Sequence, residues 1–313
     1  MRVVVFGGSG FLGSHIADTL TTHGHDVTVF DIKQSPYILP EQKMVIGDIL
    51  DAEKVEEVVN GCDVVYNLAG LADIDDCHFR PLDVTKYNIL GNTIVLEASR
   101  KTNVSRFIFA SSVYVYSESG SFYRSSKQAC ESFIENYYMI YGLPYTILRY
   151  GSLYGERADE NNGIYKLIKN AVESGKIQHY GDGEEVREYI HVHDAAELSV
   201  EILKQEYENQ NVILTGNQPL KYRDLLEMIR EILGNQYDIE YLPNRKTGHY
   251  KITPYSFNPK MGRKLIKNPF MDMGQGLLNC IAEIYEETHR EKKEEMGLIV
   301  DRNNQHNPRT VEE

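Results

Sequence analysis

Cysteine is scarce in this sequence of 313 residues. The four cysteines, Cys62, Cys77, Cys130 and Cys280, are spread along the chain, and none belongs to a C-x-x-C pair. Cysteines so few and so widely spaced argue against a disulfide framework and against a cysteine zinc site. We therefore expect all four to be reduced and to have structural roles.

Long apolar segments and basic residues are also in short supply. The chain passes from Met1 directly into a strand-like segment at Val3, and no hydrophobic run approaches the roughly 20 residues of a membrane span. Acidic side chains number 46 against 33 Lys and Arg, a formal net charge of -13. Because nucleic-acid binding needs a basic surface, this charge argues against it. We expect a cytoplasmic protein that binds neither membrane nor nucleic acid.

Strand and helix patterns alternate through the first half of the chain. Short β-branched or aromatic runs predict strands, and the segments between them have helical periodicity. Such alternation predicts an α/β fold with a Rossmann-like, doubly wound parallel sheet covered on both faces. The expected strands are 3–6, 27–30, 63–68, 106–110 and 145–149, and the expected helices are 11–22, 51–60, 85–101 and 123–141.

The rhythm changes beyond Gly151, and the length exceeds what one hydrophobic core usually serves. We expect a main domain of residues 1–151, to which the chain returns over about 188–215. A smaller C-terminal α/β domain, about 152–187 and 216–290, would hold the substrate. Residues 291–313 are polar and predict a loose tail.

Gly7, Gly10 and Gly13 form a G-x-x-G-x-x-G motif between an expected strand and an expected helix. Such a turn lets backbone amides approach a pyrophosphate at the helix N-terminus and predicts a dinucleotide site. Asp31 ends the next strand, 18 residues beyond Gly13. A carboxylate there can bind both hydroxyls of an adenosine ribose and would repel a 2'-phosphate, which favours NAD over NADP. Lys33 lies close enough to soften this preference.

Tyr123 and Lys127 lie one helical turn apart and therefore on one face of the expected helix. An adjacent ammonium and a positively charged nicotinamide ring would lower the pKa of a phenol from about 10. Tyr123 could then remove a hydroxyl proton while hydride leaves the same carbon. Ser112 follows a sheet strand at its carboxyl end, where it could hydrogen-bond the reacting oxygen.

Four segments of the chain have a recognisable pattern: Phe109-Ala-Ser-Ser-Val-Tyr-Val-Tyr116, Tyr123-x-x-Ser-Lys127 with Glu131, Leu148-Arg-Tyr150, and Val186-Arg-Glu-Tyr-Ile-His-Val-His-Asp194. Together they resemble the nucleotide-sugar epimerase/dehydratase family of extended short-chain dehydrogenases. The likeness covers about residues 1–285 and implies a Rossmann domain and a smaller domain that grip a nucleoside-diphosphate sugar.

This resemblance also implies the residues of each site. The catalytic residues would be Ser112, Tyr123 and Lys127. NAD would contact Gly7, Gly10, Phe11, Leu12, Gly13, Asp31, Ile32, Asp48, Ile49, Leu68, Ala69, Gly70, Tyr123, Lys127 and Tyr150. The substrate would contact Asn88, Ser112, Tyr114, Ser152, Asn162, Arg187 and Arg245, with Arg187 on its diphosphate because a guanidinium binds phosphate through two donors.

Departures from the family pattern narrow the expected chemistry. The 4,6-dehydratases of the family carry Asp-Glu where this chain has Val113 and Tyr114, and an unperturbed tyrosine is too weak an acid to replace that glutamate. Gly151 and Ser152 stand where many 4-epimerases carry Phe and Asn. We therefore expect a nucleoside-diphosphate-sugar 4-epimerase that works through a 4-keto intermediate, and a C4-dehydrogenase or 4-keto reductase stays open.

Two further interpretations carry less weight. His191, His193 and Asp194 could suggest a metal site, but no partner with ligand spacing appears elsewhere, so we expect no metal. A non-catalytic protein that only senses NAD would not need Tyr123 and Lys127.

We expect the functional unit to be a homodimer.

Overall fold

The structure is a computed structural model that describes residues 1–234, 236–243, 249–254, 263–267 and 270–295. Its centre is an eight-stranded sheet in the order β13-β10-β6-β5-β4-β1-β2-β3, in which every strand pair is parallel. This arrangement confirms the predicted fold class. The strands are β1 (Arg2–Phe6), β2 (Asp26–Asp31), β3 (Lys43–Ile46), β4 (Val64–Asn67), β5 (Arg106–Ser112), β6 (Tyr145–Tyr150), β10 (Gln210–Leu214) and β13 (Arg263–Leu265).

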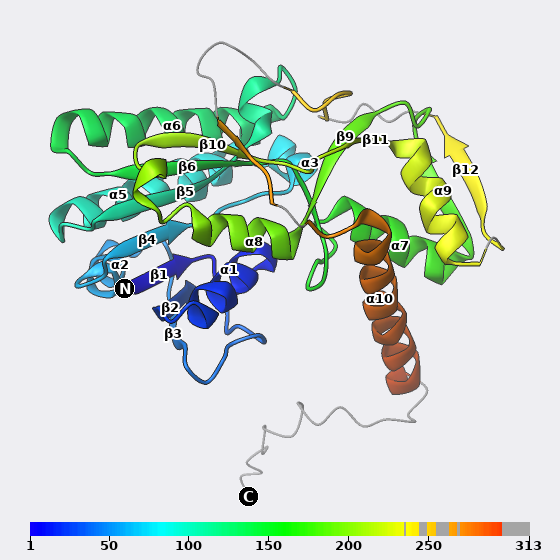
Figure 1. Ribbon diagram of the computed structural model, residues 1–313, viewed down its shortest axis with the longest axis horizontal. Coiled ribbons are helices and arrows are strands. Elements are labelled where there is room, and N and C mark those ends of the chain that lie inside the picture. Colours follow the sequence, from blue (N-terminus) through cyan, green and yellow to red (C-terminus); the bar gives the residue numbers. More distant parts are fainter. Residues whose placement is uncertain (235, 244–248, 255–262, 268–269, 296–313) are drawn as a thin grey trace, which may run out of the picture.

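Helices cover both faces of this sheet (Figure 1). The helices α1 and α8 pack against each other on one face, and α2, α5 and α6 cover the other. Each face buries its own apolar cluster, centred on β-branched side chains of the strands. The helices are α1 (Phe11–Thr22), α2 (Ala52–Val59), α3 (Ile74–Phe79), α4 (Pro81–Asp83), α5 (Gly91–Lys101), α6 (Ser121–Tyr141) and α8 (Val192–Glu201).

Two smaller sheets and three helices form the second part of the molecule. One sheet has the order β11-β9-β7 and the other pairs β12 with β8. Helices α7, α9 and α10 enclose a third apolar cluster beside them. The elements are β7 (Ser152–Tyr154), β8 (Lys176–Tyr180), β9 (Val186–His191), β11 (Pro219–Lys221), β12 (Asp238–Leu242), α7 (Gly163–Ser174), α9 (Tyr222–Ile232) and α10 (Met273–Glu295).

Three short helical segments complete the chain: the π-helix η1 (Val84–Leu90) and the 3-10 helices η2 (Val113–Tyr116) and η3 (Gln205–Tyr207). The chain returns to the large sheet at β10, within the segment expected to return, and again at β13, a second return that the sequence did not indicate. Helix α10 extends to Glu295, beyond the expected end of the substrate domain at 290. Among the described residues, none of the helices combines the length and the hydrophobicity of a membrane-spanning segment.

Candidate active site

The glycine-rich turn joins β1 to α1 through a very close backbone approach. A Cβ atom on Gly13 would lie 2.2 Å from the carbonyl oxygen of Gly7, and Gly7 itself has a φ of +76°. Gly10 is the N-cap of α1, and no side chain caps this helix. The first-turn amides, including those of Phe11 and Leu12, are therefore left for an anion, so the turn fits the pyrophosphate of a dinucleotide.

Asp31 ends β2 beside this turn. Its carboxylate accepts hydrogen bonds from the backbone N–H groups of Ser9 at 3.0 Å and Lys33 at 3.3 Å. The carboxylate therefore holds the turn in place, and the neighbouring Ile32 is exposed. These contacts place the carboxylate next to the amides of the turn, which suits the expected contact with an adenosine ribose.

The other expected cofactor contacts lie at the carboxyl ends of neighbouring strands. Asp48 follows β3 and accepts the N–H of Leu50 at 2.9 Å, whereas Ile49 is buried. Leu68 and Ala69 follow β4, and the backbone of Ala69 lies directly against Gly7. All of these positions are on the edge of the sheet where parallel α/β folds bind ligands.

Gly70 and Asn88 lock this loop to α6. The gap beside Gly70, which has a φ of +145°, is too small for a side chain because the amide oxygen of Asn88 lies there. That oxygen accepts the N–H of Leu71 at 2.7 Å, and the Asn88 amide nitrogen donates to the Leu71 carbonyl and to the Ser126 hydroxyl, both at 3.0 Å. Asn88 is thus committed to internal bonds, and its contact with substrate stays a prediction.

The structure brings the three expected catalytic side chains together. Ser112 ends β5, Tyr123 and Lys127 lie on α6, and all three are buried. The Ser112 hydroxyl hydrogen-bonds the Tyr123 phenol. The Lys127 ammonium donates to the Ala110 carbonyl at 2.7 Å and lies 5.6 Å from the centroid of the Tyr123 ring. A phenol, a hydroxyl and an ammonium are thus grouped at one strand end.

Burial shifts the pKa of the Tyr123 phenol in the direction opposite to the expected one. Burial raises the pKa of Tyr123 to about 12, and the hydrogen bond from Ser112 opposes this rise. Burial likewise lowers the pKa of Lys127. The expected lowering of the phenol pKa therefore depends on the positive charge that the oxidised nicotinamide adds, because in the protein alone desolvation is the largest influence on the Tyr123 phenol.

A buried ion pair fixes α6 against β6. Glu131, on the same helix as Tyr123, binds the Arg149 guanidinium through two N–O contacts of 2.6 and 3.0 Å. Glu131 also accepts the Ser111 hydroxyl. The Arg149 side chain is 1% exposed, so the pair lies in the interior and sets the position of the helix that carries the catalytic residues.

A group of aromatic side chains leads from Tyr123 toward Arg187. The rings of Tyr114 and Tyr123 meet edge to face at 6.3 Å between centroids, and Tyr114 packs on Tyr250 at 4.5 Å. The Arg187 guanidinium carbon lies 4.2 Å from the centroid of the Tyr250 ring. The residue that precedes Tyr250 in the chain, His249, also contacts Tyr114. The sequence did not indicate either residue, because neither lies in a recognisable motif.

The remaining residues that were expected to contact cofactor or substrate do not belong to one element. The Tyr150 hydroxyl hydrogen-bonds Ser199 of α8. Ser152 begins β7. Asn162 caps α7, accepting two backbone N–H groups and donating to the Leu153 carbonyl at 2.8 Å. Arg245 lies outside the described residues. The contacts of these four residues with cofactor or substrate stay predictions.

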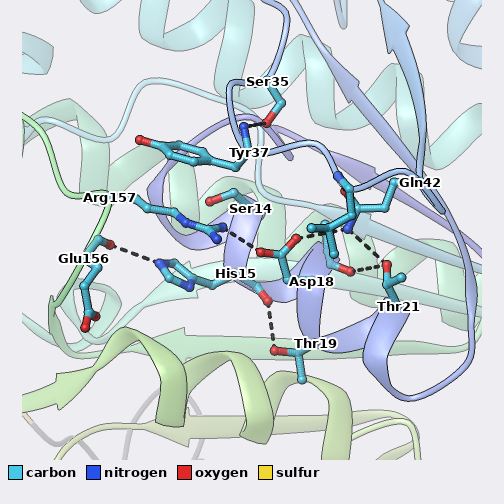
Figure 2. Close-up of polar contacts among 12 residues, drawn as sticks. Ser14, His15, Asp18, Thr19, Thr21, Ser35, Tyr37, Gln42, Glu156 and Arg157 are labelled. Atoms are coloured by element: carbon cyan, nitrogen blue, oxygen red, sulfur yellow. Dashed lines mark hydrogen bonds and ion pairs between the residues drawn. The ribbon is translucent and has the colours of Figure 1, made fainter.

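Figure 2 shows a second polar cluster, which joins the two parts of the molecule. The Arg157 guanidinium binds Asp18 of α1 at 2.8 Å. A ring nitrogen of His15, also on α1, lies 3.0 Å from the Glu156 backbone carbonyl, and burial lowers the pKa of His15 to about 4. The segment after β7 is therefore tied to the first helix of the large domain.

Glu156 also approaches the histidines that the sequence singled out. The nearest ligand-type atoms of Glu156, His191 and His193 lie within 4.8 Å of one another. The Nδ1 atom of His191 accepts the N–H of His193 at 3.3 Å. A neutral His191 then carries its proton on Nε2, 3.2 Å from the Glu156 carboxylate. A protonated Nε2 suits a contact with the carboxylate rather than a metal, and the absence of a metal stays a prediction.

Comparison with known proteins gives consistent matches. The sequence model of the NAD dependent epimerase/dehydratase family matches residues 3–215. A Methanocaldococcus jannaschii protein named as a candidate UDP-glucose 4-epimerase is 29% identical, over 89% of this chain and 97% of that protein. The UDP-N-acetyl-alpha-D-glucosaminuronate decarboxylase of Bacillus cytotoxicus is 26% identical, over 84% and 88%.

A solved structure agrees with these matches. The UDP-glucose 4-epimerase of Thermus thermophilus, in complex with NAD, superimposes with a TM-score of 0.78 and 25% identity. The superposition covers 91% of this chain and 99% of that one. The similarity therefore extends over both parts of the molecule.

Proposed function

Because the chain belongs to the NAD-dependent epimerase/dehydratase family, we propose that it epimerises a nucleoside-diphosphate sugar at C4 through a 4-keto intermediate. Its cofactor is NAD. The observation that carries the proposal is the grouping of Ser112, Tyr123 and Lys127 at one strand end. Arg187 lies at the other end of the group of aromatic side chains that begins at Tyr123. This arrangement offers a base for a sugar hydroxyl and, at a distance, a cation for a diphosphate.

The proposed roles follow from these positions. Tyr123 takes the proton of the C4 hydroxyl, and the Ser112 hydroxyl hydrogen-bonds the same oxygen. When bound, NAD supplies the hydride acceptor for C4. Lys127 holds positive charge near the phenol, which favours its ionised form. Because Tyr123 keeps the proton, it can return it when hydride comes back to the opposite face of the sugar.

The direct test starts from purified protein. Denaturation should release NAD or NADH, which absorbance and mass spectrometry identify. Incubation with a panel of nucleotide sugars should then give a C4 epimer. A 4-keto sugar as the only end product would favour the dehydrogenase alternative, and a protein that neither carries NAD nor converts any sugar would contradict the proposal.

Asp31→Ala should weaken NAD binding by about 1 to 3 kcal/mol and reduce discrimination against NADP, because a charge-assisted hydrogen bond is lost. The same change releases the Ser9 amide, so Asp31→Asn, which keeps an acceptor oxygen, separates loop support from charge. Titration of each variant with both cofactors measures the effect. Tighter binding of NADP than of NAD by the wild type would contradict the ribose assignment.

Arg187→Ala should raise the KM for a nucleoside-diphosphate sugar on the order of 10- to 100-fold, since hydrogen bonds to charged groups contribute about 1.5 to 3 kcal/mol. Bound NAD should stay in place. Steady-state kinetics and cofactor analysis of the same preparation check both points. Arg187→Lys keeps the charge but not the two-donor fork, so we expect an intermediate KM. Equal loss of cofactor and substrate would place Arg187 elsewhere.

The oligomer proposed here is a homodimer formed through α6 and its neighbours. Large apolar side chains are exposed on α6 and on the adjoining segment 79–90, namely Phe79, Leu82, Leu90, Phe133, Met139 and Ile140. Contacts between α6 and both α3 and η1 make these elements one surface. An apolar surface shared by neighbouring elements fits a second copy of the chain.

The cytoplasmic location stays a prediction.

Light scattering should give twice the chain mass of 35.9 kDa. Phe133→Glu should shift the protein toward monomer, because it places a charge in the apolar contact. Tyr241→Glu, at a similarly exposed position on β12, is the matched control and should leave the mass unchanged. A monomeric wild type would contradict the proposal.

A further inference from the structure

Tyr114 lies where a bound sugar would have to pass, if the proposed function is right. Its ring contacts both that of Tyr123, on the reacting side, and that of Tyr250, beside Arg187. A nucleoside-diphosphate sugar that reaches Tyr123 with its reacting carbon and Arg187 with its diphosphate must therefore lie along Tyr114.

Two further side chains extend from Tyr114. Its phenol oxygen lies 2.6 Å from Nδ1 of His249. The Nε2 atom of His249 lies 3.8 Å from a carboxylate oxygen of Asp75, at the start of α3. His249 is 135 positions from Tyr114 in the chain, so only the folded structure makes this Tyr114-His249-Asp75 array.

The contacts within this array determine which atoms of His249 and Tyr114 carry a proton. Burial lowers the pKa of His249, and Asp75 opposes this effect. A neutral imidazole keeps one proton, and the Asp75 carboxylate favours that proton on Nε2. Nδ1 is then an acceptor, and the Tyr114 hydroxyl must donate to it. Burial also raises the pKa of Tyr114, so the phenol stays protonated with its single hydrogen directed at His249.

We propose that His249 fixes the Tyr114 hydroxyl as a hydrogen-bond acceptor toward the sugar, so that the site selects a hydroxyl-bearing sugar over a uronic acid. With its hydrogen on His249, the phenol oxygen presents only lone pairs to the substrate. A sugar hydroxyl can donate to these lone pairs. A carboxylate has no donor and meets them with repulsion. The substrate class is a nucleoside-diphosphate hexose that is neutral in its sugar part.

The test compares three probes by calorimetry on the NAD-loaded protein: UDP, UDP-glucose and UDP-glucuronic acid. The wild type should bind UDP-glucose about tenfold or more tightly than UDP-glucuronic acid. His249→Leu removes the acceptor and frees the Tyr114 hydrogen. It should tighten UDP-glucuronic acid about tenfold and weaken UDP-glucose, with UDP unchanged. His249→Asn can again accept from Tyr114 and should restore the wild-type order.

A double variant identifies Tyr114 as the residue through which His249 acts. In the Tyr114→Phe background, His249→Leu should no longer change the preference between the two sugars. Equal weakening of both sugars by His249→Leu would mean that the residue only supports the fold, and the inference would be overturned. A wild type that binds UDP but prefers UDP-glucuronic acid would overturn it too, leaving the proposed function intact. Failure to bind any of UDP, dTDP, GDP and ADP would overturn both, and binding of another of these in place of UDP would move the same comparison to its glucose and glucuronic acid derivatives.

Discussion

Tyr123→Phe should slow hydride transfer by about 100- to 10,000-fold, the usual range for a lost general base. The substitution removes only the phenol oxygen, and the ring keeps its edge-to-face contact with Tyr114. Folding and NAD binding should therefore persist. Single-turnover absorbance of NADH, measured with a nucleoside-diphosphate sugar, reports the effect directly.

The matched control for this variant is Tyr66→Phe. Tyr66 is also buried and loses a single hydrogen bond, the one from its hydroxyl to the Ser199 carbonyl at 2.7 Å. We expect a loss of stability and little change in hydride transfer. An unchanged rate in the Tyr123 variant would remove the catalytic assignment and most of the case against a non-catalytic NAD-binding protein.

The same measurement has a pH dependence of known sign. Oxidation at C4 needs the ionised phenol, so its rate should rise about tenfold per pH unit until the phenol pKa is reached. Burial raises the pKa of Tyr123 to about 12 in the protein alone. The positive charge of bound NAD together with Lys127 should bring the apparent pKa below 10. A rate that falls as the pH rises from 6 to 9 would contradict a phenol base.

Glu131→Ala should lower the free energy of unfolding by about 3 to 5 kcal/mol, because it leaves the Arg149 guanidinium buried without a counter-charge. The matched control is Glu56→Ala on α2. Glu56 and Lys101 form an ion pair with the same N–O distance, 2.6 Å, but both side chains are about half exposed. The control should cost less than about 1 kcal/mol.

Urea unfolding of both variants measures the difference. Equal losses in the two variants would show that burial does not set the strength of the Glu131 pair. Because α6 carries Tyr123 and Lys127, the Glu131 variant should also lose activity at temperatures where it is still folded. Stabilising osmolytes should not restore that part of the loss, since it comes from a displaced helix rather than from unfolded protein.

Local patterns predicted much of the fold. The glycine turn and its acidic partner are close in sequence, and alternating strands and helices leave few topologies for a parallel sheet. Short segments at the sheet edge were harder to foresee. The strand β13 has three residues, too few for a recognisable period, and joins the large sheet only through β10.

Contacts between distant segments account for what the sequence could not predict at the site. The sequence singled out Tyr114 as a substrate contact, but its hydrogen-bond partner His249 comes from a segment with no motif. The contact between Glu156 and His191 likewise joins segments that are distant in the sequence, so residue spacing could not predict it. The raised pKa of Tyr123 depends on how deeply α6 is buried, a property that spacing along a helix does not contain.

The π-helix η1 has a consequence for insertions and deletions in this chain. Its hydrogen bonds span five residues, as in the bond from the Gly91 N–H to the Lys86 carbonyl, so it holds extra backbone compared with an α-helix. Deleting one residue between 84 and 87 would allow an ordinary helix to form there. Each residue of an α-helix turns the chain by about 100°, so the segment on one side would rotate relative to Asn88. The segment would then gain regular helix geometry. Asn88 would lose the position from which its amide holds the Gly70 loop.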